Sequence, residues 1–205
     1  MIDLYTSDTS NGQRVAIMLE ECGLEYAVRK FDLMRGEHRN PEFLNINPAG
    51  TIPAIVDHDG PGGNPLALAQ SGAILLYLAM KTGTFFPIDP ALRAEAFQWF
   101  MQATTDCAPA SGIIFQLTRL VPEKSSSNVA FFEERLRKFL RVVDTHLTGR
   151  AHLAGEVSIA DFALYPVTAA RRELIEGDTG LVHLKRWMTT IGARPAVVRG
   201  MLAAA

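Results

Sequence analysis

The chain has 205 residues, of which 48% are hydrophobic and 20% charged, typical of a folded globular protein. Its formal net charge of −2 offers no basic surface for nucleic acid or an anionic membrane, and no apolar run approaches the roughly 20 residues of a membrane span. The N-terminus lacks a signal-peptide layout. Cys22 and Cys107 are too far apart for a disulfide framework or a metal cluster. We therefore expect a cytoplasmic protein with no metal, nucleic-acid or membrane partner.

The first part of the chain predicts a β-α-β unit. Residues 2–5 form a short apolar strand, and a polar loop leads into a helix with apolar residues at helical spacing, ended by Gly23. Ser10 followed by Gln13 fits a capping box with Ser10 as N-cap. Residues 25–32 predict a second strand, which favours a parallel pair with a right-handed crossover.

The next strand begins at Ile52-Pro53, after a helical turn at 41–44. Proline cannot sit inside a paired central strand, and an Ile-Pro bond where a strand begins is a good candidate for a cis peptide. A cis bond would turn the backbone N–H and C=O of Ile52 outward, towards an extended peptide-like ligand. Taken alone, the pattern fits an ordinary turn proline better, and the strand and helix that follow decide between the two.

A returning strand over 66–69 and a helix over 71–81, opened by Gln70, complete a β-α-β-α-β-β-α order within residues 1–82. That order predicts an α/β layered domain built on a mixed sheet. A linker over 83–89 follows.

The second half has no strand signal and predicts an all-helical domain over 90–205. One helix begins at Asp89-Pro90 and should bend near Pro109. The remaining helices are expected at 129–147, from the Ser158–Asp161 capping box, at 184–191 and from Pro195.

Several of these motifs resemble the cytosolic glutathione transferase family along the whole chain. They are Ile52 to Asp57, Gln70 to Ile74, the Ser158 to Asp161 box and Arg194-Pro195. The segments 9–13, 31–33 and 41–44 look most like the bacterial Nu-class branch, whose members act on glutathione disulfides. The resemblance implies a thioredoxin-like first domain with a cis Pro53, a helical second domain lining the second-substrate site, and a homodimer.

The same resemblance implies a glutathione site in the first domain. The Ile52 backbone, beside Pro53, would pair with the cysteinyl residue. Gln70 would bond the γ-glutamyl end, where most relatives carry glutamate. Ser71 and the helix N-terminus would hold the γ-glutamyl carboxylate, and His38 would contact the glycyl end. Simpler roles are open for two of them, a helix cap for Ser71 and a solvated loop residue for His38.

The reaction needs a thiolate, because a thiol is a poor nucleophile. Donors at the start of the first helix, namely the Thr9 and Ser10 hydroxyls and the Asn11 amide, are placed to lower the thiol pKa. The resemblance implies that Thr9 and Asn11 face the sulfur, whereas capping suits Ser10 better. Tyr5 ends the first strand too early for catalysis, and packing explains it better.

The second-substrate pocket is expected to include Phe100, Thr104 and Cys107. Cys107 could form a mixed disulfide with glutathione, although helix packing explains it better. Cys22 lies on an apolar stripe and is expected to be buried and inert. Phe131-Phe132 occupies the region where Nu-class relatives carry an arginine that holds a second glutathione. This departure argues against the binding of two glutathione molecules.

Three functions fit this sequence. The first is a glutathione-dependent disulfide reductase, in which bound glutathione or glutathione disulfide exchanges with a small disulfide. The second is conjugation of glutathione to a small electrophile. The third is a non-catalytic module that keeps the fold for protein contacts. The complete set of glutathione-site residues favours the first two.

Overall fold

In a computed structural model of the chain, all residues from Met1 to Ala205 are described. They form two compact units, one of residues 1–86 together with 193–205, and one of residues 87–192. The first unit contains a mixed sheet with helices, and the second is helical throughout, which confirms the predicted fold class. None of the helices combines the length and apolar character needed to cross a lipid bilayer.

The first unit is built on a four-stranded sheet with strand order β2-β1-β3-β4. The strands are β1 (Ile2–Thr6), β2 (Tyr26–Lys30), β3 (Ala54–Asp57) and β4 (Leu66–Ala69). β1 and β2 are parallel, as predicted, and β3 runs antiparallel to both β1 and β4. Consequently β1, β2 and β4 all end at the edge of the sheet where β3 begins.

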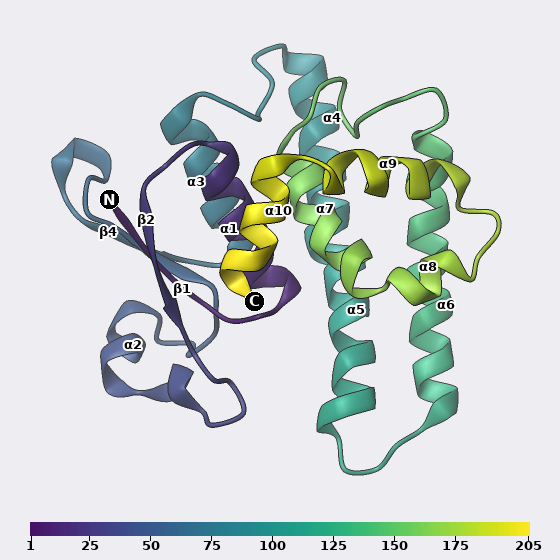
Figure 1. Cartoon of the computed structure of the whole chain (residues 1–205), viewed down its shortest axis with the longest axis horizontal. Coiled ribbons are helices and arrows are strands. Elements are labelled where there is room, and N and C mark those ends of the chain that lie inside the picture. The colour runs from purple at the N-terminus through teal and green to yellow at the C-terminus, as the bar shows by residue number, and fades with distance from the viewer. The chain divides into compact units, whose positions relative to one another are not determined.

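Four α-helices belong to this unit, and Figure 1 shows α1 and α3 on one face of the sheet and α2 on the other. Their bounds are α1 (Ser10–Glu21), α2 (Pro41–Ile46), α3 (Ser71–Thr82) and α10 (Pro195–Ala204). Short 3₁₀ turns cover Glu37–Arg39 and Pro61–Gly63. The core lies between the sheet and α1 with α3, where Leu4, Ile17, Ile55 and Leu75 are fully buried.

The last helix differs from the predicted domain division, because α10 packs on α1 of the first unit. Gly200 lies so close to α1 that a Cβ added there would be 2.5 Å from the backbone N and Cα of Ile17. Arg194 forms a two-pronged ion pair with Glu21 at 2.6 and 2.7 Å. Residues 193–205, which were predicted to belong to the helical domain over 90–205, therefore belong to the first unit.

The second unit contains one long helical run that pairs with α6, and the two form a hairpin (Figure 1). The run consists of α4 (Pro90–Met101), a π-helical stretch η3 (Gln102–Cys107), α5 (Ala108–Phe115) and a second π-helical stretch η4 (Gln116–Leu120). The other helices are α6 (Ser126–His146), α7 (Ile159–Ala170), α8 (Arg172–Glu176) and α9 (Val182–Gly192). The short helix α8 was not predicted.

Near Pro109, where a bend was expected, the helical run continues, and the π-helical stretch η3 lies directly before the proline. Proline has no N–H, so Pro109 cannot donate to the residue four positions before it, Thr105. Just before it, the Ala108 N–H bonds the carbonyl of Ala103, five residues back. The wider π-helical turn thus lets the helix continue past the proline without its N–H, as π-bulges do in long helices.

Asp161 organises the core of the second unit. Its side chain is fully buried and accepts the N–H of Ser158 at 2.9 Å and the indole N–H of Trp187 at 2.8 Å. The Leu153 N–H donates to the same carboxylate at 3.2 Å. The predicted capping box with Ser158 is confirmed, and the role of Asp161 is structural.

Candidate functional site

The candidate site lies at the sheet edge where three adjacent strands meet. Tyr5 of β1 pairs with Ala54 of β3, and Ala54 pairs with Ala69 of β4. Neighbouring strands are about 4.8 Å apart, so these three positions span about 10 Å. These three paired residues adjoin the segments of interest. Tyr5 is followed by the loop before α1, Ala54 is preceded by the Ile52-Pro53 bond, and Ala69 is followed by the start of α3. The fold therefore collects three segments that are far apart in the sequence.

Thr9, rather than Ser10, is the N-cap of α1, and the predicted capping box is wrong because the third helical residue is Gly12, which has no side chain to reach back. The Thr9 hydroxyl oxygen accepts the Gly12 N–H at 3.1 Å, and Ser10 is the first residue of the helix. The Gln13 side chain does not reach back to the cap but donates to Asp8 at 2.8 Å. Thr9 thus has a structural role, and its contact with the glutathione sulfur stays a prediction.

The loop before α1 is tight because of Gly12. A Cβ at Gly12 would lie 2.2 Å from the Thr6 hydroxyl oxygen and 2.5 Å from the Ser7 carbonyl oxygen. Only glycine fits there, so the helix begins close against the end of β1. Asn11, in the first turn, is exposed, and its amide is available to a ligand. The backbone fixes the position of Asn11 while its side chain remains open.

The Ile52-Pro53 peptide bond is cis, as predicted. The preceding loop is held by Asn47, which is buried and donates from Nδ2 to the Thr51 carbonyl at 2.6 Å and to its hydroxyl at 3.2 Å. Gly50 has a φ of +58°, the left-handed region that favours glycine. Ile52 itself precedes β3 and lies outside the sheet ladder.

His38 lies beside this loop, in the 3₁₀ turn after β2. Its carbonyl oxygen would be 3.6 Å from a Cβ added at Gly50, so the two segments are in contact. The imidazole Nδ1 is buried without a hydrogen-bond partner, which leaves Nε2 as the ring atom that could meet a ligand.

The start of α3 has the features of an anion-binding helix end. Gln70 precedes the helix with φ 70° and ψ 111°, a strained conformation for a residue other than glycine, and its side chain makes no cap. Ser71 is the first helical residue, and the first N–H used within the helix is that of Ile74. The N–H groups before Ile74 and the positive end of the helix dipole favour an anion there.

Arg14 reaches this helix end from α1, and sequence reasoning missed it. Its side chain is buried, and Nη1 donates to the Ser71 hydroxyl oxygen at 3.4 Å. The only sequence signal is a charged residue beside the apolar positions of α1, and its burial depends on where α3 packs.

Tyr5 packs in an aromatic cluster, which agrees with the packing role expected for it. Its ring lies 6.1 Å from the ring of Phe31 and 5.6 Å from that of Phe43, measured between centroids. Burial, together with the negative charge of Asp3, raises the pKa of the Tyr5 phenol. The phenol therefore stays protonated at neutral pH.

The residues expected at the second-substrate pocket lie in the second unit. Phe100 and Cys107 are buried, with Cys107 fully inaccessible, while Thr104 is half-buried and its hydroxyl donates to the Phe100 carbonyl at 2.9 Å. Cys107 is thus closed to solvent. The Phe131 side chain is 63% exposed and packs edge-on against Phe132.

Cys22 differs from expectation because it is only half-buried. It follows α1, and its sulfur lies 3.5 Å from the Thr82 hydroxyl and 3.8 Å from that of Thr84. Burial raises the pKa of the Cys22 thiol, although the threonine hydroxyls partly oppose it. Cys22 is therefore a protonated thiol in the first unit.

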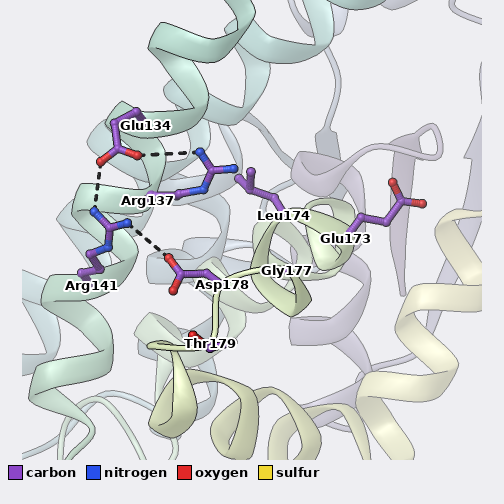
Figure 2. Close-up of a pocket in the computed structure, with 8 residues that line it drawn as sticks. All are labelled: Glu134, Arg137, Arg141, Glu173, Leu174, Gly177, Asp178 and Thr179. Carbon is purple, nitrogen blue, oxygen red and sulfur yellow. Dashed lines mark hydrogen bonds and ion pairs between the residues drawn. The ribbon is translucent and has the colours of Figure 1, made fainter.

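A pocket of about 420 Å³ opens in the second unit, between α6 on one side and α8 with the segment that follows it on the other (Figure 2). Its arginines are already held by carboxylates. Arg141 contacts Glu134 at 3.0 Å and Asp178 at 3.3 Å, and Arg137 contacts Glu134 at 3.7 Å. A backbone hydrogen bond from Gly180 lowers the pKa of Asp178, and Arg141 assists. This ion-pair network ties α6 to the turn after α8.

The chain belongs to the glutathione S-transferase family, which confirms the family indicated by the sequence motifs. Residues 10–81 match the family model described as "Glutathione S-transferase, N-terminal domain". Residues 98–195 match the one described as "Glutathione S-transferase, C-terminal domain".

Within that family the chain is 38% identical to "Disulfide-bond oxidoreductase YfcG" of Escherichia coli (strain K12), over 100% of this chain and 96% of the relative. It is also similar to two solved structures. One is a glutathione transferase from Pseudomonas putida with one glutathione disulfide bound per subunit, with a TM-score of 0.91, 35% identity and coverage of 98% and 90% of the two chains. The other is a family member from Pseudomonas fluorescens with two glutathione bound, with a TM-score of 0.90, 36% identity and coverage of 98% and 92%.

Proposed function

We propose that the chain is a glutathione-dependent thiol–disulfide oxidoreductase whose tripeptide site lies at the sheet edge. The observation that carries the proposal is the row Tyr5–Ala54–Ala69, which brings together the α1 loop, the Ile52 backbone and the α3 N-terminus. An extended γ-glutamyl-cysteinyl-glycine fits this arrangement, because main-chain pairing suits its centre and a helix end suits its anionic end. The glutathione ligands of the Pseudomonas relatives and the name of YfcG support it.

In this proposal the γ-glutamyl carboxylate meets Ser71 and the first N–H groups of α3. The cysteinyl backbone pairs with Ile52, Gln70 bonds the γ-glutamyl end, and His38 contacts the glycyl end. The sulfur then lies beside Thr9 and Asn11. Hydrogen bonds from these residues and the positive end of the α1 dipole favour the thiolate over the thiol.

The thiolate attacks one sulfur of a disulfide, so that a new S–S bond forms as the original S–S bond breaks. The departing thiolate takes a proton from water. A second glutathione thiolate attacks the glutathionyl sulfur of the mixed disulfide, which gives glutathione disulfide and the second reduced thiol. The two electrons come from the two glutathione molecules.

Parallel assays test the reaction class. We expect glutathione-dependent reduction of 2-hydroxyethyl disulfide to exceed conjugation of 1-chloro-2,4-dinitrobenzene. Activity on the electrophile alone would instead make the protein a conjugating transferase. Activity on neither substrate, with glutathione still bound in calorimetry, would favour a binding module.

The Ser71→Ala variant tests the site itself. We expect it to weaken glutathione binding by roughly 1–3 kcal/mol, because a charged acceptor loses one hydrogen bond. Ser126→Ala is a matched control. Ser126 is also the first residue of a helix, α6, but it is exposed and that helix end is capped by Ser125. Equal affinity of wild type and Ser71→Ala in calorimetry would overturn the assigned site.

A further inference from the structure

Arg14 is a buried arginine that joins α1 to α3. Its side chain is 1% exposed, whereas arginine is almost never fully buried in proteins unless it is paired. Its Nη1 lies 3.4 Å from the Ser71 hydroxyl oxygen. The guanidinium thus sits directly behind the first residue of the helix end described above.

The direction of this hydrogen bond determines what Ser71 can do. A guanidinium carries only donors, so the Ser71 oxygen must be the acceptor. The hydroxyl hydrogen is then left for another group, and no protein acceptor takes it. Ser71 is 8% exposed, at the end of a helix whose N-cap residue, Gln70, supplies no side-chain cap. The Ser71 O–H is therefore placed to donate a hydrogen bond to a bound ligand.

We infer that Arg14 is a positioning residue that holds the Ser71 hydroxyl as a donor to the α-carboxylate of the γ-glutamyl residue. Arg14 thereby makes the site selective for thiol ligands that carry this carboxylate. The inference rests on the proposed function. The buried guanidinium also adds a positive charge behind the hydroxyl, where charge interactions are screened less than in water. Arginine suits the position because its charge is permanent and its planar donors are rigid.

The test compares two ligands in calorimetry. One is glutathione, and the other is γ-aminobutyryl-cysteinyl-glycine, which lacks only the γ-glutamyl α-carboxylate. We expect Arg14→Met to weaken glutathione binding about tenfold or more, because the hydrogen bond from Ser71 to the charged carboxylate is no longer held in place. Its affinity for the analogue should stay within about twofold of wild type, since the contact that Arg14 serves is absent there. Arg14→Lys should recover part of the glutathione affinity.

A steady-state measurement gives an independent readout. In Arg14→Met the KM for glutathione should rise while kcat at saturating glutathione is retained, because uniform binding is lost and the thiolate contacts are not. The double variant Arg14→Met/Ser71→Ala should bind glutathione about as well as Ser71→Ala, because the two residues act through one hydrogen bond.

Melting curves show whether each variant folds. If Arg14→Met does not fold, Arg14→Lys and Arg14→Gln carry the same two-ligand comparison. Equal losses for both ligands, or additive losses in the double variant, would overturn the role of Arg14 and leave the proposed function intact. A wild-type protein that binds no glutathione would instead overturn the proposed function.

Discussion

The Asn47 side chain donates a 2.6 Å hydrogen bond from Nδ2 to the Thr51 carbonyl, across the loop that leads to Ile52-Pro53. The same amide group reaches the Thr51 hydroxyl, and Asn47 Oδ1 accepts the Ala49 N–H at 3.2 Å. One buried side chain therefore fixes the backbone that the proposed function assigns to the cysteinyl residue.

Removing this amide should lower both stability and ligand affinity. We expect Asn47→Ala to reduce the free energy of unfolding by about 1–3 kcal/mol, because buried polar groups of the loop lose their partner. Glutathione binding should weaken in parallel. Urea unfolding and calorimetry measure the two effects. Asn64→Ala is the control, since Asn64 is exposed and its side chain makes only a 3.4 Å contact to the Gly62 carbonyl. A loop variant that binds glutathione normally would contradict this view of Asn47.

Asn11 should affect the thiol without affecting the fold. Its side chain is exposed, so Asn11→Ala should change stability by no more than about 0.5 kcal/mol. If its amide hydrogen-bonds the thiolate, the apparent pKa of bound glutathione rises in the variant and the rate at neutral pH falls roughly tenfold or more. The ultraviolet absorbance of the thiolate, titrated against pH, reports that pKa.

Thr9 serves as the contrast to Asn11, because it also caps α1. Thr9→Ser should keep both the cap and the donor, whereas Thr9→Ala should additionally cost about 0.5–2 kcal/mol of stability. An unchanged thiol pKa in Asn11→Ala would remove Asn11 from the proposed site.

Two helix glycines should respond in opposite directions to alanine. At Gly200 a Cβ would meet the backbone of Ile17 at 2.5 Å, so Gly200→Ala should push α10 off α1 and cost about 1–3 kcal/mol or more. At Gly112 of α5 no atom outside the helix's own nearby backbone lies within 4 Å of the added Cβ, so Gly112→Ala should stabilise by about 0.5–1 kcal/mol. Thermal unfolding of both variants checks the pair. Equal melting shifts would argue against the close approach of α10 to α1.

Asp57 should contribute stability that disappears in acid. Burial alone would raise its pKa, but hydrogen bonds from Lys81, Tyr77 and the Asp59 N–H outweigh burial and hold the pKa below its usual value. A depressed carboxyl pKa stabilises the fold at pH values above the unfolded pKa of about 3.9, and the contribution is lost as pH falls through the folded-state pKa.

The variant Asp57→Asn isolates this contribution. Near neutral pH we expect it to be less stable than wild type by about 1.5–3 kcal/mol, since charge-assisted bonds to a buried carboxylate are lost. The gap should narrow as the pH is lowered below about 4. Urea unfolding over a pH series measures the gap, and a gap independent of pH would contradict the assignment.

Much of the fold could be predicted because local patterns determined it. The apolar strands, the Ile52-Pro53 bond and the Ser158–Asp161 box all act within a few residues. The start of α1 could not be placed to one residue, because Thr9 and Ser10 are both good caps. The choice between them depends on how closely Gly12 packs against Thr6, which is a tertiary contact.

The site residues divide in the same way. Ile52, Gln70 and Ser71 belong to continuous motifs, and the β1–β3–β4 register brings their segments to one edge. Arg14 could not be assigned, because its role arises from a partner that the sequence pattern does not specify. For Arg14 that partner is 57 residues away.

Because α10 packs on α1, the first unit is made of two segments that are separate in the sequence. Its closing helix is synthesised only after the whole second unit, so a nascent N-terminal half leaves the ribosome with the outer side of α1 uncovered. Chimeras that exchange halves between family members should therefore carry residues 193–205 together with 1–86. A crossover placed only in the linker would give α1 a foreign helix to pack against.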